Sequence, residues 1–90
     1  MNSSRPNRKG LSDYTDSNGD LCFKLYNTVI LRFNEGMIEL NSGGWNTNHT
    51  KNCINDLLPS GYKLFQRDFV WYVNTPQGVI DFRDGMQFNV

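Results

Sequence analysis

The chain has 90 residues, with nine basic and nine acidic side chains and no net charge. This length limits it to one small domain, in which a deep catalytic cavity would be hard to support. The balanced charge argues against binding to nucleic acid or membranes through overall charge alone. Because no apolar run approaches the roughly 18–20 residues of a membrane span and no signal peptide opens the chain, we expect a protein of the cytoplasm without membrane contact.

The first twenty residues carry few apolar side chains. Leu11 and Tyr14 are the only sizeable ones among Ser, Asn, Asp, Gly and Arg residues. Such a segment cannot bury enough surface to offset the entropy lost on ordering. We therefore predict a disordered arm over residues 1–20 and a single α+β domain over residues 21–90. The basic end of the arm contains Arg5, Arg8 and Lys9. An inert tail is the simpler interpretation, and an arm that folds on a partner is the alternative.

A strand-like pattern begins at Leu21. We expect strands at Leu21–Tyr26, Thr28–Phe33 and Met37–Leu40, with a hairpin turn at Asn34-Glu35-Gly36. Alternation in the second of these strands places Val29, Leu31 and Phe33 on one face.

One helix follows, from about Asn48 to Leu58, with Thr47 or Asn48 as its N-cap. Its apolar residues recur at helical spacing and form one stripe: Cys53, Ile54, Leu57 and Leu58. Pro59-Ser60-Gly61 ends it.

The second half of the chain has the pattern of a meander. Its expected strands are Tyr62–Arg67, Phe69–Val73, Val79–Arg83 and Met86–Val90. Turns are predicted at Thr75-Pro76-Gln77-Gly78 and at Asp84-Gly85. The element order is therefore βββ-α-ββββ, and the predicted fold is α+β, with a single helix packed on a twisted antiparallel sheet or a partly closed barrel.

The residue types that metal sites and catalysis require are sparse. His49 is the only histidine, and it precedes Cys53 by four residues. That spacing on a helix would bring both side chains near one ion, but no CxxC motif, HxxxH motif or second histidine completes a site. Because Cys53 lies on the predicted core face, we expect an inert thiol rather than a thiol–imidazole pair. We predict no metal, no cofactor and no enzymatic activity, with Cys22 and Cys53 as buried free thiols.

Gly43-Gly44-Trp45 leads into the predicted helix start. The first turn of a helix has unpaired backbone N–H groups that favour anions. The candidate binding residues here are Trp45, Thr47, His49, Thr50 and Lys51. They offer hydroxyl, imidazole and ammonium groups beside a ring that can stack on a base. Simple capping of the helix is the alternative interpretation.

The aromatic strands of the second half predict a further surface. If Phe69, Trp71 and Val73 face the helix, Tyr72 points outward. The candidate residues of this surface are Lys63, Phe65, Arg67 and Tyr72. An exposed aromatic pair beside two cations is typical of a platform on which bases stack. The alternative is a sheet that is buried on both faces, with the basic residues at its rim.

Several short motifs occur together in the middle of the chain. They are Asn27-Thr28-Val29, Gly43-Gly44-Trp45-Asn46-Thr47, Thr50-Lys51, Ile54-Asn55, Phe65-Gln66-Arg67 and Trp71-Tyr72-Val73. In this order and spacing, they resemble a family of short proteins encoded by tailed bacteriophages. The resemblance covers about half of the chain. It implies a phage origin and action in the cytoplasm of the bacterial host, and it carries over no catalytic or ligand residues.

These observations favour a small non-enzymatic phage binding module. The leading hypothesis is contact with nucleic acid or a nucleotide through the helix start. A protein-binding accessory factor that modulates a host enzyme or defence system is the alternative, and a minor virion structural protein is the third. The sequence leaves the oligomeric state open.

Overall fold

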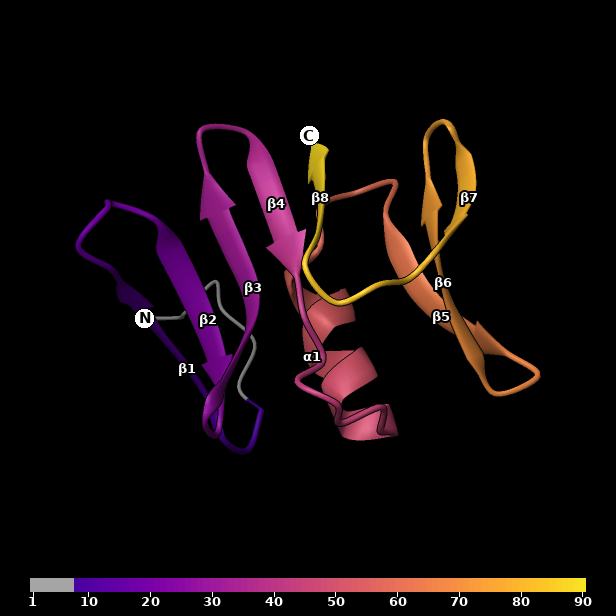
Figure 1. Cartoon of the computed structure of the whole chain (residues 1–90), viewed down its shortest axis with the longest axis horizontal. Coiled ribbons are helices and arrows are strands. Elements are labelled where there is room, and N and C mark those ends of the chain that lie inside the picture. The colour runs from indigo at the N-terminus through magenta and orange to yellow at the C-terminus, as the bar shows by residue number, and fades with distance from the viewer. Residues whose placement is uncertain (1–7) are drawn as a thin grey trace.

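The structure, a computed structural model, describes residues 8–90. Within them it has one helix and eight strands, arranged in two antiparallel sheets (Figure 1). The elements are β1 (Leu11–Thr15), β2 (Leu21–Leu25), β3 (Thr28–Asn34), β4 (Met37–Leu40), α1 (Asn48–Leu57), β5 (Lys63–Arg67), β6 (Val70–Thr75), β7 (Gly78–Asp81) and β8 (Met86–Asn89). The larger sheet has the order β1-β2-β3-β4-β8, and the smaller has the order β5-β6-β7. The predicted α+β class is confirmed; the strands form two sheets that do not close into a barrel.

Strand β1 corrects the prediction that residues 1–20 are disordered. It pairs antiparallel with β2, from Leu11 opposite Leu25 to Thr15 opposite Leu21. The turn between them explains how so polar a segment is ordered, because the Asp16 carboxylate accepts the backbone N–H groups of Asp20 and Asn18, each at 2.9 Å. These two bonds hold the pKa of Asp16 below its usual value, and the bond from Asp20 has the larger effect. Residues 1–7, and Arg5 with them, lie outside the described part of the chain.

A β-bulge in β3 decides which side chains reach the core. Phe23 pairs with Leu31 and Lys24 pairs with Val29, so Ile30 is an additional residue on β3. As a result Ile30 and Leu31 are both buried although they are neighbours in the sequence. The predicted face of Val29, Leu31 and Phe33 is therefore only partly right. Leu31 is buried, but Val29 is half-buried and Phe33 is exposed at the end of the strand.

Helix α1 lies between the two sheets and contacts both β3 and β5 (Figure 1). Thr47 is its N-cap, and the Thr47 hydroxyl accepts the backbone N–H of Thr50 at 3.2 Å. Cys53 and Ile54 are fully buried in the core that the helix shares with the strands. Both cysteines of the chain are buried and unpaired in the structure.

The side chain of Asn55 fastens α1 to the smaller sheet. Its amide N–H donates to the carbonyl of Leu64 at 2.8 Å, and its amide oxygen accepts the N–H of Leu64 at 2.7 Å. The side chain thus bonds to β5 as a neighbouring strand would. This contact covers the edge of β5 next to the helix.

Replacing Asn55 with Ala should destabilise the protein strongly. The Leu64 N–H and carbonyl lose their partners, and a half-buried pair of this kind costs about 2–3 kcal/mol. For a domain of this size the melting temperature should fall by roughly 10 °C or more. Asn52→Ala, on an exposed position of the same helix, is the matched control and should change the melting temperature little. Equal effects of the two variants in thermal unfolding would contradict this account of helix docking.

Candidate functional site

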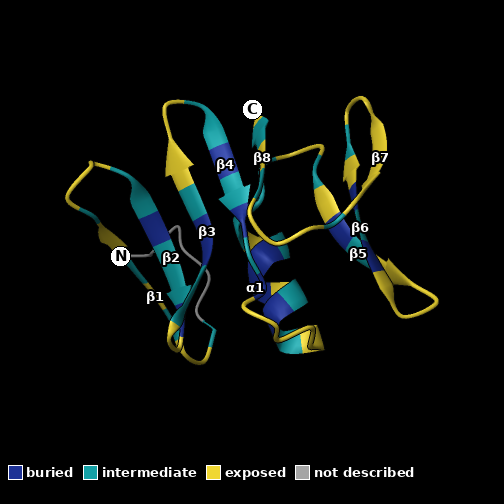
Figure 2. Ribbon diagram, in the orientation of Figure 1, coloured by how far each residue is buried: buried dark blue, intermediate teal, exposed yellow. Residues whose placement is uncertain are grey.

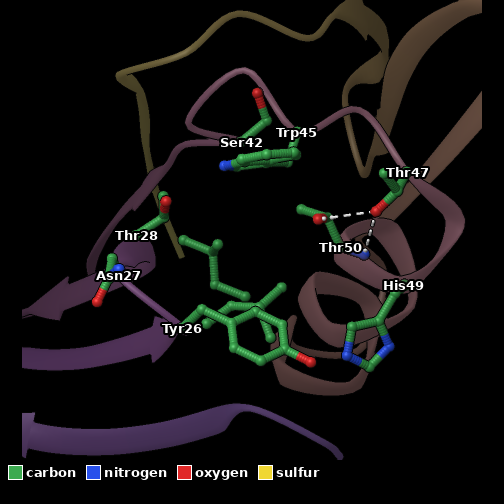
Figure 3. Close-up of a pocket in the computed structure, with 10 residues that line it drawn as sticks. Tyr26, Asn27, Thr28, Ser42, Trp45, Thr47, His49 and Thr50 are labelled. Atoms are coloured by element: carbon green, nitrogen blue, oxygen red, sulfur yellow. Dashed lines mark hydrogen bonds between the residues drawn. The ribbon is translucent and has the colours of Figure 1, made fainter.

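A pocket of about 530 Å³ lies between the start of α1 and the turn that joins β2 to β3 (Figure 3). Its lining residues are Leu25, Tyr26, Asn27, Thr28, Ile30, Ser42, Trp45, Thr47, His49 and Thr50. Four of the residues predicted at the helix start therefore meet here, namely Trp45, Thr47, His49 and Thr50. Lys51, the fifth, does not line the pocket.

Two aromatic rings form opposite sides of this pocket. Figure 3 shows Trp45 on one side and Tyr26 on the other, with Asn27 and Thr28 between them along one margin. Trp45 is 65% exposed and Tyr26 is 56% exposed. Leu25 and Ile30, both buried, supply the apolar interior. The arrangement leaves a slot with two aromatic walls that opens to solvent.

Glycines allow the close packing behind two pocket walls. Gly43 has a φ of +65°, and a Cβ atom at this position would lie 2.6 Å from side-chain atoms of Thr28. Gly10 has a φ of +79°, and a Cβ atom there would lie 2.5 Å from the ring of Tyr26. A larger residue at either position would be strained and would displace a wall of the pocket.

The loop that carries Trp45 is fixed by a residue from the distant connection between β7 and β8. The Asp84 carboxylate accepts the backbone N–H and the hydroxyl of Ser42, each at 2.8 Å. Ser42 is buried, and its hydroxyl oxygen in turn accepts the N–H of Gly44 at 3.1 Å. The N–H of Trp45 donates to the Ser42 carbonyl at 3.0 Å. The sequence indicated only a turn at Asp84, so the hydrogen bonds by which Asp84 fixes the Trp45 loop were not predicted.

His49 is held at the pocket margin by the segment that precedes β1. Its Nε2 lies 2.8 Å from the carbonyl oxygen of Lys9, and because a carbonyl only accepts, Nε2 carries the hydrogen. The Cys53 sulfur lies 3.9 Å from the same nitrogen. Burial raises the pKa of the Cys53 thiol, so this thiol stays protonated at neutral pH. The contact is therefore not an activated thiolate–imidazolium pair.

The first turn of α1 is capped by the side chain of Thr47. The Thr47 hydroxyl accepts the N–H of Thr50 and also lies 3.1 Å from the Thr50 hydroxyl. No Lys or Arg is among the pocket's lining residues, and most of the surface that they expose to the pocket is apolar. The Thr47 hydroxyl therefore serves as the cap of the helix, and Lys51, the ammonium group of the predicted anion site, lies outside the pocket lining.

The second predicted surface is assembled on the outer face of the smaller sheet. Phe65 pairs with Tyr72, and their ring centroids are 5.6 Å apart. The alternation of β5 places Lys63 and Arg67 on the same face as Phe65. Asp81 lies directly opposite Tyr72 on β7, so this face carries both signs of charge.

The inner face of the same sheet is buried, with one difference from the prediction. Leu64, Trp71 and Val73 are buried there, as expected for Trp71 and Val73. Phe69 does not face the helix; it is 94% exposed. Asp68 and Phe69 both have positive φ and form the turn between β5 and β6, which directs the ring of Phe69 away from the core.

Within residues 8–90, no three His, Cys, Asp or Glu side chains are placed to hold a metal ion together. None of the helical structure in the described range has the length and apolar character of a membrane span.

A family model described as Kyanoviridae Gp96 protein matches residues 7–89. The chain belongs to this family. Membership of the Kyanoviridae Gp96 family confirms the expected relationship to short phage proteins. No curated protein and no solved structure matches the chain.

The contact between Gly43 and Thr28 can be tested with neighbouring glycines. Gly43→Ala and Gly44→Ala both introduce a side chain at positive φ, which costs about 1 kcal/mol. A Cβ atom at Gly44 meets open space, whereas one at Gly43 meets Thr28. Gly43→Ala should therefore lower the free energy of unfolding by roughly 1–3 kcal/mol more than Gly44→Ala does. Chemical denaturation measures both, and equal losses would contradict the close packing.

Proposed function

We propose that this phage protein is a non-enzymatic binding module of the host cytoplasm whose pocket takes a nucleobase, from a nucleotide or from single-stranded nucleic acid. The observation that carries the proposal is the position of Trp45. Its ring is 65% exposed, yet its loop is fixed by hydrogen bonds to Ser42 and Asp84. An exposed aromatic ring on an ordered loop, opposite a second ring from Tyr26, is suited to stack on a planar ligand.

The polar groups around the slot favour a neutral ring over a phosphate. The Asn27 amide and the Thr28 hydroxyl line the pocket and have no hydrogen-bond partner within residues 8–90. An amide and a hydroxyl can each donate and accept, as recognition of a base edge requires. With no cation in the lining, the phosphate of a bound nucleotide would stay in solvent. The proposal thus keeps the predicted nucleic-acid or nucleotide partner but moves the contact from the phosphate to the base.

The size of the pocket agrees with one ligand of this kind. Small-molecule sites in proteins measure about 300–1,000 Å³, and this pocket has about 530 Å³. The faces of a base become accessible to such rings only when the base is not stacked between its neighbours in a duplex. This favours single nucleotides or single strands over duplexes.

Binding of a protein partner is the second candidate function. The smaller sheet carries exposed apolar side chains, with Phe69 at 94% and Val70 at 48% exposure. Lys63 and Arg67 lie on this sheet, but Asp81 and Asp68 offset their charge. Mixed charge around exposed apolar side chains fits a protein surface better than a nucleic-acid backbone.

Replacing Trp45 with Ala tests the proposed function directly. One base–aromatic stack contributes about 1–3 kcal/mol, so the affinity for nucleosides and short single-stranded oligonucleotides should fall roughly 5- to 150-fold. Trp45→Phe should retain part of the affinity because a ring remains. Isothermal titration with nucleosides, nucleotides and oligonucleotides gives the affinities. Because the Trp45 ring is largely exposed, its removal should leave the melting temperature nearly unchanged.

Three controls separate the possible sites. Phe69→Ala removes an exposed ring far along the chain and should not affect base binding. Lys51→Glu should also have little effect, since Lys51 does not line the pocket. Nucleosides should bind about as well as nucleotides, with weak dependence on salt. Strong loss of binding in Lys51→Glu together with a steep salt dependence would refute the base pocket and restore the anion site at the helix start.

A further inference from the structure

Strand β7 is an open edge of the smaller sheet. The strand order is β5-β6-β7, and β7 pairs with β6 on one side (Figure 1). Within residues 8–90 no strand pairs with its other side. All four residues of β7 are exposed (Figure 2). The opposite edge differs, because Asn55 of α1 bonds to Leu64 of β5.

The register of β6 and β7 identifies the backbone groups at this edge. The N–H of Phe82 donates to the carbonyl of Trp71 at 3.1 Å. In an antiparallel ladder, hydrogen-bonded pairs alternate with non-bonded pairs. Ile80, opposite Val73, is therefore in a bonded pair, and its N–H and carbonyl point toward β6. The N–H and carbonyl groups of Val79 and Asp81 point outward, away from the sheet.

The side chains of β7 do not protect this edge. Val79 is 56% exposed and Ile80 is 43% exposed. Natural edge strands are commonly guarded by lysine, by proline or by a bulge. Gly78–Asp81 has none of these, and Asp81, at its end, is its only charged residue. An open groove of about 680 Å³ lies between β7 and residues 83–87, and a chain that approaches Val79 and Ile80 would enter this groove.

We propose that β7 pairs antiparallel with β7 of a second copy of this chain, around a twofold axis that passes beside Ile80. In this register Ile80 faces Ile80 of the second copy as a non-bonded pair. Val79 faces Asp81 of the second copy, and their outward N–H and carbonyl groups form hydrogen bonds. The symmetry repeats this pair, so the outward groups of Val79 and Asp81 are satisfied on both strands.

Side chains and charge fit a second copy on this edge. Ile80 continues the row of Leu64 and Val73 across the sheet, and the twofold axis joins this apolar row to its equivalent. Each Asp81 meets a valine, so no like charges face each other. The chain has no net charge and does not repel itself over longer range. Because a four-residue strand buries less than the roughly 1,200 Å² of a stable interface, the dimer is weak and depends on concentration.

Proline at position 79 tests the proposed interface. The N–H of Val79 points outward, so Val79→Pro removes a dimer hydrogen bond without breaking a bond between β6 and β7. Sedimentation should show the average mass of the wild type rising toward that of two chains between about 10 µM and 1 mM. Val79→Pro should remain a single chain over the same range. Val79→Ala, which keeps the N–H, should still associate.

Two results would overturn the proposal. One is a wild type that stays a single chain up to about 1 mM. In that case β7 does not pair with a second copy, and a strand of another protein would be the alternative partner. The other is a Val79→Pro variant that associates as strongly as the wild type. If Val79→Pro lowers the melting temperature, Ile80→Lys serves instead, since it places two ammonium groups across the twofold axis. None of these outcomes depends on ligand binding at the pocket. The dimer and the proposed base-binding function are therefore tested independently of each other.

Discussion

The fold depends on one side chain that acts as a strand partner. Within residues 8–90 the two sheets are not paired with each other, and α1 contacts both. Cys53 and Ile54 of α1 contribute apolar packing. Because apolar packing is not directional, it does not by itself fix the position of the helix along β5 or its alignment with the residues of that strand. The two hydrogen bonds between Asn55 and Leu64 fix both. They also satisfy the outward N–H and carbonyl of Leu64 on the edge of β5, whereas no side chain of the described residues does the same for β7.

The pocket is a consequence of how this scaffold is connected. Its walls come from the β2–β3 turn, the loop before α1 and the first turn of α1. Each of these segments is in contact with a residue that is distant in the sequence. Asp84 fixes the loop of Trp45, and Gly10 packs against the ring of Tyr26. Binding residues on loops that a rigid framework positions are common among functional sites. Here the aromatic walls stay ordered although both are largely exposed.

Much of the fold followed from local signals, and the exceptions have specific physical reasons. The helix, its Thr47 cap and most strands follow from apolar spacing and turn residues. Strand β1 was missed because its order comes from a side-chain turn at Asp16 and from pairing with β2, not from its own apolar content. The bulge at Ile30 could not be predicted from the alternation of apolar and polar residues along the strand.

For the pocket, the spacing of Gly43-Gly44-Trp45 indicated the loop and the helix start. Tyr26 and Asp84 could not be placed there from the sequence, because each reaches the pocket through tertiary contacts.

The contacts of residues 8–10 have a practical consequence for handling the protein. Arg8 pairs with Asp56, Lys9 bonds to His49 and Gly10 lies under Tyr26. A fusion joined directly at residue 8 would therefore start close to the pocket, whereas Val90, whose N–H donates to the Gly36 carbonyl, lies away from it.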